Sequence, residues 1–203
     1  MAIIKSGDSS DLLKIDGVSK AARVTLYDSQ GREISFGGKN TYAAATGIFT
    51  PPATPTDMSC LWGSATKTIR VLACHIAGLQ TATGINLFNL IKRSTANSAG
   101  TWNAATAVPL DANDAAATAS VGWYTANPTL GSVVGNIRTA RVCCSIATGL
   151  LVPPFDLLQF CRNDELSKLP VLRGAAQGLA VNFGGAALPA GLTMAVEWVW
   201  LEE

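Results

Sequence analysis

Ionised side chains are scarce in this sequence, since 14% of its 203 residues are charged against about 25% in an average soluble protein. The 15 basic and 14 acidic residues leave a net charge of +1, so no overall field would draw the chain to nucleic acid or to an anionic membrane. Hydrophobic residues make up 48%. A surface with so few charges is best tolerated when another subunit covers part of it, so we expect burial in an assembly.

Long apolar runs are also missing. No stretch approaches the roughly 18 residues that span a bilayer as a helix. Asp8 and Asp11 fall where the apolar core of a signal peptide would lie. We therefore expect a protein made in the cytoplasm without a signal peptide, with neither a membrane nor a nucleic acid as its partner.

Residues that carry enzyme chemistry are few. His75 is the one histidine, and it lies in an apolar strand pattern typical of core or interface positions. No nucleophile elbow, zinc-protease motif, phosphate loop or dinucleotide-binding motif occurs. Cys74 and His75 are neighbours, so on a strand they point apart and cannot share a metal. We expect no enzyme, no catalytic residue, no cofactor and no metal site.

The acidic residues of the body have structural interpretations. Asp111, Asn113 and Asp114 resemble a calcium loop but lack its glycine and distal glutamate, so we interpret them as turn caps. Glu197 stands in an otherwise apolar run, so it needs a cationic partner or the rim of an interface. Its expected partner is one of three arginines: Arg70, Arg138 or Arg141.

The five cysteines show no CxxC spacing. An odd number in a cytoplasmic chain predicts reduced thiols in the core or at interfaces. If the adjacent Cys143 and Cys144 lie on one strand, they face opposite ways, so at most one of them is buried in a given layer.

The charges divide the chain into three parts. Residues 1–40 hold 11 of the 29 charged residues, which predicts a polar N-terminal arm followed by a β-hairpin over 23–36. Residues 41–56, rich in Thr, Ala and Pro, predict a linker or an extended edge segment. Residues 57–203 form the body.

The body is predicted to be all-β. Strand-like runs recur at 67–76, 85–93, 121–124, 137–146, 156–160, 171–172, 178–183 and 192–201. Glycine and proline between them favour a jelly-roll-like sandwich of two sheets. In the run 67–76, strict alternation would place Ile69, Val71, Ala73 and His75 on one side.

Three tryptophans are candidate contact residues. Trp198 and Trp200 share one face with Met194 and Val196. That face is expected to lie in the core or at a subunit interface. Our hypothesis is that the two tryptophans lie at a subunit interface. Trp102 lies in a polar segment over 94–105, where it is a candidate for an exposed surface contact.

Three segments resemble virion structural proteins of tailed bacteriophages. They are SGDSSDLLKIDGVSKAARVTLYDSQGRE at 6–33, LIKRSTANSAGTWNAATAVPLDANDAAATASVGWYTANPTLG at 90–131, and PVLRGAAQGLAVNF at 170–183. The three segments are spread over most of the chain, from residue 6 to residue 183, but the resemblance carries over no functional residue. It implies a jelly-roll-like body and a capsid decoration (cement) protein on the outer surface of the head. The partners that it implies are the major capsid protein and, in a homotrimer, the chain itself.

On this interpretation the arm anchors the protein to the capsid. Seven residues of the arm are the hypothetical anchoring residues: Lys5, Leu12, Leu13, Lys14, Ile15, Lys20 and Arg23. An alternative is a receptor- or glycan-binding head of a fibre, spike or tail protein, in which Trp102 contacts the host. A virion-borne depolymerase is the third interpretation, disfavoured by the scarcity of acid–base groups.

Overall fold

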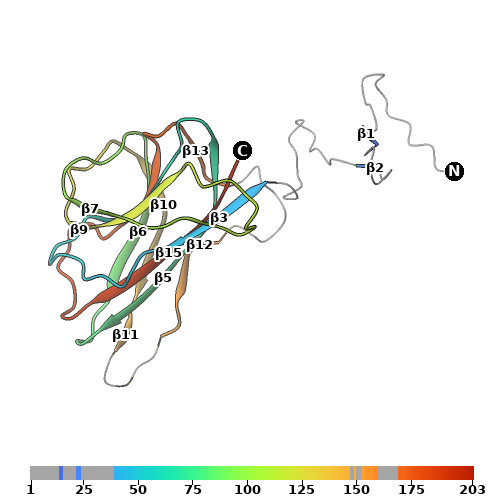
Figure 1. Ribbon diagram of the computed structural model, residues 1–203. Helices are drawn as coiled ribbons and strands as arrows, with labels where there is room; N and C mark the ends of the chain where they lie inside the picture. Colours follow the sequence, from blue (N-terminus) through green and yellow to red (C-terminus); the bar gives the residue numbers. More distant parts are fainter. Residues whose placement is uncertain (1–13, 16–21, 24–38, 147–148, 150–151, 160–168) are drawn as a thin grey trace.

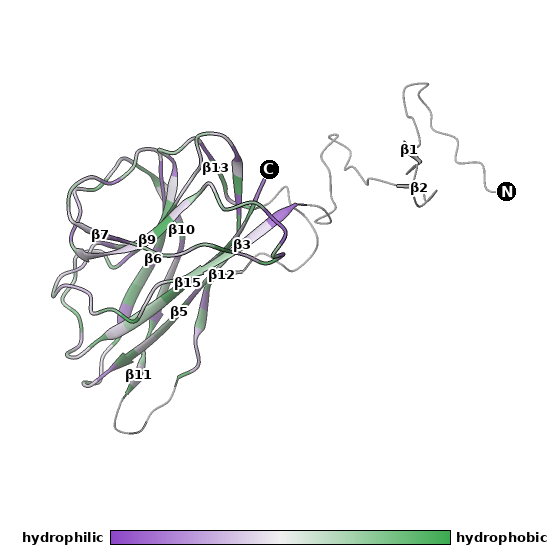
Figure 2. Cartoon of the chain, in the orientation of Figure 1, coloured by the Kyte–Doolittle hydropathy of each residue, from purple (hydrophilic) through white to green (hydrophobic). Residues whose placement is uncertain are grey.

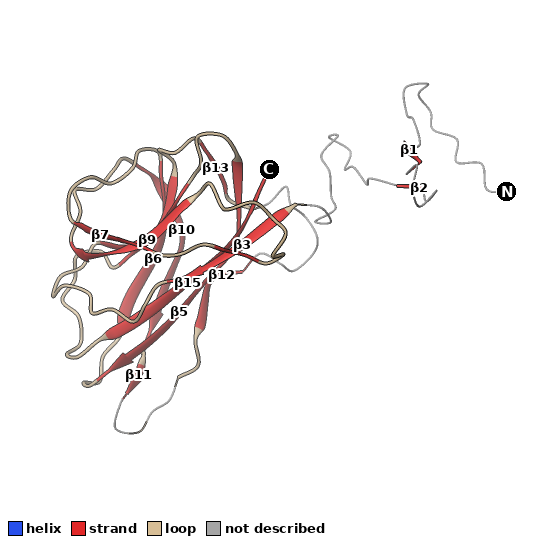
Figure 3. Cartoon of the chain, viewed as in Figure 1, coloured by secondary structure: helices blue, strands red, loops and turns tan. Residues whose placement is uncertain are grey.

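Every regular element of the described chain is a β-strand (Figure 3). The computed structural model describes residues 14–15, 22–23, 39–146, 149, 152–159 and 169–203. Two sheets pack face to face as a sandwich, which confirms the predicted all-β, jelly-roll-like fold (Figure 1). The described residues contain no helix that could cross a membrane.

One sheet has seven strands. They are β3 (Asn40–Ala45), β5 (Thr68–Gln80), β8 (Val108–Pro109), β11 (Ser145–Ile146), β12 (Phe155–Gln159), β13 (Val171–Arg173) and β15 (Thr193–Glu202). β15 is central, between β5 and β3. The long strand β5 pairs on its other edge with β13, β12 and β11 in turn.

The second sheet has six strands in the order β10-β6-β14-β4-β9-β7. Their bounds are β4 (Asp57–Trp62), β6 (Asn86–Arg93), β7 (Thr101–Ala104), β9 (Ser120–Ala126), β10 (Val133–Val142) and β14 (Gly178–Asn182). The predicted single strand over 137–146 is therefore wrong. β10 belongs to this sheet and β11 to the other, so the chain changes sheets at Cys143 and Cys144.

The core lies between the two sheets, and apolar residues from both contribute to it (Figure 2). The predicted inner face of the last strand is confirmed, since Met194, Val196, Trp198 and Trp200 are each at most 2% exposed. The Trp198 indole Nε1 donates to Ser59 Oγ of β4 at 2.9 Å. This hydrogen bond links the layers and satisfies a buried donor.

A bulge in β5 changes which of its residues face the core. Trp200 pairs with Val71 and Val199 with Ala73, so Leu72 is the extra residue. Beyond it the core face carries Cys74 and not, as strict alternation predicted, Ala73 and His75. Leu72 instead packs in a small separate cluster with Leu169 and Leu201.

Of the two structures predicted for residues 41–56, a linker or an extended edge segment, the observed one is closer to the edge segment. β3 occupies 40–45 and pairs with β15 over six residue pairs and with β8 on its other edge. Phe49 then forms a bridge to Met194 and stacks on Trp123 at 6.1 Å. The segment belongs to the sandwich because its small Thr and Ala residues form a strand near the sheet edge.

Candidate functional site

The predicted anchoring residues fall largely outside the described chain. Lys5, Leu12, Leu13 and Lys20 lie outside it, as does the predicted hairpin over 23–36 apart from Arg23. The remaining three residues lie in a two-stranded antiparallel pair, β1 (Lys14–Ile15) and β2 (Ala22–Arg23). Lys14 is opposite Arg23 in that register, so the backbone brings two of the predicted cationic residues to one position.

Trp198 and Trp200 are not free for a subunit interface. Both are 0% exposed within the single chain. Trp200 stacks on Tyr42 at 5.8 Å and donates from its indole Nε1 to Glu202 at 3.1 Å. The hypothesis failed because alternation shows that the two rings share a face but does not show which surface covers it.

Trp102 is also less available than its polar surroundings predicted. It lies in β7, paired with Tyr124 of β9, and their rings are 4.9 Å apart. The indole is half-buried and packs against the core. Part of its surface still faces solvent.

An acid–base row crosses the outer face of the seven-stranded sheet. The registers place Asp156 of β12 and Glu197 of β15 on either side of His75 in β5. His75 Nδ1 lies 2.5 Å from Asp156 Oδ1. Both side chains are partly exposed, so His75 does not lie in the core. The row resembles part of a proton relay, but its third member is a carboxylate and not a nucleophile.

The expected arginine partner of Glu197 is not found among the described residues. Arg70 pairs with Glu203 at 3.0 Å. Arg138 and Arg141 lie on β10 in the other sheet. Glu197 is solvent-exposed, so water stabilises its charge. No group of three or more metal-ligating side chains occurs in the part of the chain that the structure describes.

A buried ion pair and its hydrogen-bond partners join three strands and the loop after β6, and nothing in the sequence pattern indicated it. Asp57 and Arg93 are 0% and 1% exposed at their side chains. Arg93 donates to Asp57 from Nε and, at 2.8 Å, from Nη2. Asn182 and Asn97 donate to the same carboxylate at 2.7 and 2.8 Å. With its lone pairs satisfied in this way, the carboxylate can remain charged while buried.

The four described cysteines are unpaired. Burial raises the pKa of Cys60 and of Cys74 well above the ordinary thiol value, and nearby carboxylates add to both shifts. Burial, then the neighbouring Cys143, raises the pKa of Cys144 to about 11. Cys144 is buried and Cys143 is partly exposed, but neither lies on a strand, so the prediction from strand alternation does not apply to them. Cys161 lies outside the described residues.

The turn prediction at Asp111 is confirmed. Its Oδ1 accepts a hydrogen bond from the backbone N–H of Asn113 at 2.9 Å and from the Asn113 side chain at 3.0 Å. Asp114 closes the turn by donating from its backbone N–H to the carbonyl oxygen of Asp111 at 3.0 Å. These are turn-capping bonds.

The strand β10 forms an exposed edge of the six-stranded sheet. It has no neighbour beyond β6 among the described strands. Three of its apolar side chains are open to solvent: Val133 at 56%, Val134 at 61% and Ile137 at 38%. An open edge strand with exposed apolar side chains is a template for pairing with another chain.

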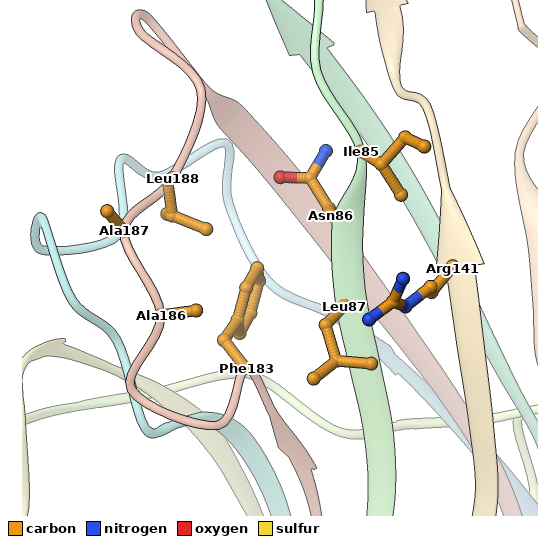
Figure 4. A pocket seen from close by; sticks show the side chains of 8 residues that line it. All are labelled: Ile85, Asn86, Leu87, Arg141, Phe183, Ala186, Ala187 and Leu188. Atoms are coloured by element: carbon orange, nitrogen blue, oxygen red, sulfur yellow. The ribbon is translucent and has the colours of Figure 1, made fainter.

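A small pocket lies between β6 and the loop that follows β14 (Figure 4). Its volume is about 240 Å³. It is lined by Ile85, Asn86, Leu87, Arg141, Phe183, Ala186, Ala187 and Leu188. Figure 4 shows Arg141 reaching from β10 over Leu87, with the Phe183 ring between β6 and the loop. The pocket is mainly apolar, with one cationic and one amide side chain.

Comparison with known proteins finds no matching family model, no matching curated protein and no matching solved structure. The function must therefore be argued from the surfaces described above.

Proposed function

We propose that this chain is a structural protein of a tailed-bacteriophage particle, namely a decoration protein that binds and stabilises the head shell. The proposal joins the resemblance of three sequence segments to the β-sandwich architecture. Its partners would be the major capsid protein and further copies of the chain in a homotrimer.

The exposed edge strand β10 carries the proposal. Isolated sandwiches protect their edges with charge, proline or short strands, because open edges aggregate. β10 carries two exposed arginines, Arg138 and Arg141, in its second half, but its first half exposes Val133, Val134 and Ile137. Such an edge suits a protein that works in an assembly, where a neighbouring subunit covers it.

Low surface charge supports the same function. Only 14% of the residues are charged, so few ionised side chains hydrate the surface of the body. Such a surface is suited to being covered by another subunit. Charge is instead concentrated in residues 1–40. In a decoration protein this arm would contact coat subunits through its cationic and apolar residues, and the sandwich would project from the shell.

The first experiment is cryo-electron microscopy of the phage particle whose genome encodes the chain. Density for the sandwich at the three-fold or quasi-three-fold axes of the head is the expected result. Density at a tail tip or fibre would overturn the decoration function in favour of host binding. Absence of the chain from purified particles, checked by mass spectrometry, would overturn both.

Charge reversal in the arm tests the anchoring hypothesis in the full-length chain. The variant carrying Lys14→Glu, Lys20→Glu and Arg23→Glu should bind empty capsids about tenfold more weakly or worse, because the cationic contacts become repulsive. Lys67→Glu, an exposed position of the body, is the matched control and should bind as wild type. Equal occupancy of the triple variant and the control would exclude this mode of anchoring.

A further inference from the structure

The edge strand β10 presents its exposed side chains in a defined order. Its first half exposes Val133, Val134 and Ile137, and its second half exposes Arg138 and Arg141. β10 ends the six-stranded sheet, so no described strand pairs with its outer edge. Neither arginine forms an ion pair with a described residue. A strand that completes this edge should set apolar residues against the first half and acidic residues against the second.

A second copy of β10 does not meet this requirement, because the strand contains no acidic residue. An antiparallel pair of two such strands would set the cationic half of each against the apolar half of the other. A parallel pair in register would place like charges opposite each other. An antiparallel pair also has two-fold symmetry, so it yields a dimer and not the proposed trimer. The partner strand must therefore come from another segment.

One segment of the N-terminal arm matches the spacing of the two arginines. Arg138 and Arg141 are three residues apart, and two pairs of acidic residues in the sequence share that spacing. These are Asp8 with Asp11, and Asp111 with Asp114. Hydrogen bonds within the turn at Asp111 already hold the second pair. Asp8 and Asp11, which lie outside the described residues, are the acidic pair left for the edge of β10.

The residues that follow Asp11 in the sequence are complementary to the apolar half of β10. In an antiparallel pair, the acidic residues at the start of the segment meet the arginines at the end of β10. One register then matches four positions: Arg141 with Asp8, Arg138 with Asp11, Ile137 with Leu12, and Val134 with Ile15. Opposite charges and apolar side chains in direct opposition both stabilise strand pairing. From Arg138 to Val142, which includes both arginines, β10 pairs with β6 without a register shift.

The described part of the arm has an open edge at the same place. Lys14 and Ile15 form β1, which pairs with β2 on one side. No other described strand pairs with β1. Residues 8–16 can therefore add to β10 while β1 keeps its pairing with β2. Lys20 and Arg23 fall outside the paired segment, so they remain available for contact with a capsid.

The arm joins the sandwich on the side opposite to β10. It leads into β3, which pairs with β15 on the side away from β5. β10 instead contacts β12, which pairs with β5 on the side away from β15. A chain would have to lead its arm back across the whole body to cover its own β10. Residues 17–39 span at most about 80 Å when extended, at roughly 3.3–3.6 Å per residue. They are long enough to reach a neighbouring copy, and the position of β3 favours that copy.

We propose that residues 8–16 of one copy add as an antiparallel strand to the open edge of β10 in the next copy, with Asp8 opposite Arg141 and Asp11 opposite Arg138. The arm and the edge are different surfaces, so the contact is head-to-tail, and three such contacts close into a ring. The inference rests on the homotrimer of the proposed function and names the segment that forms it. It does not depend on where the trimer sits in a particle.

The first test is charge reversal, read by analytical ultracentrifugation of the full-length chain free in solution. The wild type should be a trimer. The edge variant (Arg138→Glu with Arg141→Glu) and the arm variant (Asp8→Arg with Asp11→Arg) set like charges opposite each other. Each should weaken association by at least about tenfold.

Combining the two reversals gives the decisive variant. All four changes together restore opposite charges in the same register, so association should return to within about threefold of wild type. Lys67→Glu with Arg173→Glu is the matched control, since it makes the same change of charge at two exposed positions outside β10. It should associate as wild type. Far-UV circular dichroism checks that every variant is folded.

Cross-linking identifies which copy donates the arm. Ser10 is opposite Thr139 in the proposed register, and Thr139 is exposed. Ser10→Cys with Thr139→Cys, oxidised by glutathione disulfide, should give covalent dimers and trimers on a non-reducing gel, because directly opposite Cβ atoms are close enough for a disulfide. Ser10→Cys with Thr50→Cys, at an exposed position outside β10, is the control and should give at most a tenth as much, about the background level.

Each contrary result points to a different part of the proposal. A wild-type chain that is monomeric at about 100 μM would overturn the arm pairing and the homotrimer, while the particle experiment would still decide binding to the head shell. Reversal variants that remain trimeric like the control would overturn the arm pairing and leave the homotrimer standing. Failure of the combined variant to reassociate would overturn the proposed register. A disulfide formed only within single chains would assign the edge to the chain's own arm.

Discussion

At the scale of single residues, the Asp57–Arg93 pair is the interaction with the largest expected effect on stability. Two opposite charges lie almost wholly out of water. The desolvation cost of both is offset only while each has its partner. Asn97 and Asn182 complete the coordination of the carboxylate. The pair therefore holds β4, β6 and the loop after β6 in one arrangement.

Asp57→Ala should lower the free energy of unfolding by about 3–5 kcal/mol, because it leaves the Arg93 charge buried without a partner. Urea unfolding measures the change. Glu197→Ala, at an exposed carboxylate, is the control and should change stability by less than about 0.5 kcal/mol. Adding Arg93→Ala to Asp57→Ala should cost less than the sum of the single changes. Strict additivity would contradict a coupled pair.

The buried thiols predict a loss of stability at alkaline pH. In the folded chain the pKa of Cys144 is about 11, and the pKa values of Cys60 and Cys74 are also raised. Above a pH of about 9 the unfolded chain releases these protons and the folded chain does not. The contribution of the buried thiols to the free energy of unfolding is therefore fully present below about pH 8, and it is lost as the pH rises from about 9 to 11.

Urea unfolding in reducing buffer, repeated from pH 7 to 11, measures this dependence. Above pH 9, the slope of the free energy of unfolding against pH reports how many more protons the folded chain holds than the unfolded chain. Cys144→Ala should lower that number by up to about one proton and leave the slope below pH 8 unchanged. A wild-type stability that stays constant up to pH 11 would show that the thiols are not kept neutral by the fold.

At the scale of elements, close packing in the six-stranded sheet depends on a glycine. Gly178 of β14 pairs with Trp62 of β4. A Cβ at position 178 would lie 2.1 Å from Trp62 Cε3. The indole is 7% exposed and packed in the core, so it has little freedom to move. Only a residue without a side chain allows this register.

Gly178→Ala should destabilise the protein by about 1–3 kcal/mol through overpacking. Gly135→Ala, in the edge strand β10, is the matched control because a Cβ there meets nothing within 4 Å. Its effect should stay within about 0.5 kcal/mol. Chemical denaturation of both variants checks the difference. Equal effects would mean that Trp62 moves aside without cost.

Much of the strand pattern could be predicted from the sequence, because alternation and turn residues are local signals. The faces of β5 could not, since the bulge at Leu72 comes from its pairing with β15. Of the candidate pocket nothing was predicted. Asn86, Arg141 and Phe183 come from three separate strand regions, and only the sheet pairing brings them together.

At the scale of the whole molecule, the open edge of β10 should decide whether copies associate. We expect the wild-type chain to sediment as a trimer. The double variant Val134→Lys and Ile137→Lys should be monomeric, because charged side chains on an edge strand oppose strand pairing.

The control is Ile48→Lys, which changes an apolar residue that is 82% exposed and lies outside β10. It should remain associated, and the far-UV circular dichroism of all three proteins should show the same folded β-structure. Analytical ultracentrifugation measures the oligomeric state. Association of the β10 double variant at wild-type strength would place the interface elsewhere.

The sequence by itself determined the all-β class and which residues of the last strand share a face, because period-two alternation is a property of the local backbone. It also determined the turn at Asp111 through a short-range hydrogen bond. The tertiary structure alone decided what covers each face. Trp198 and Trp200 meet the opposite sheet, His75 faces outward, and Asn86 opens into a pocket. These outcomes depend on contacts between residues far apart in the chain, which no local pattern records.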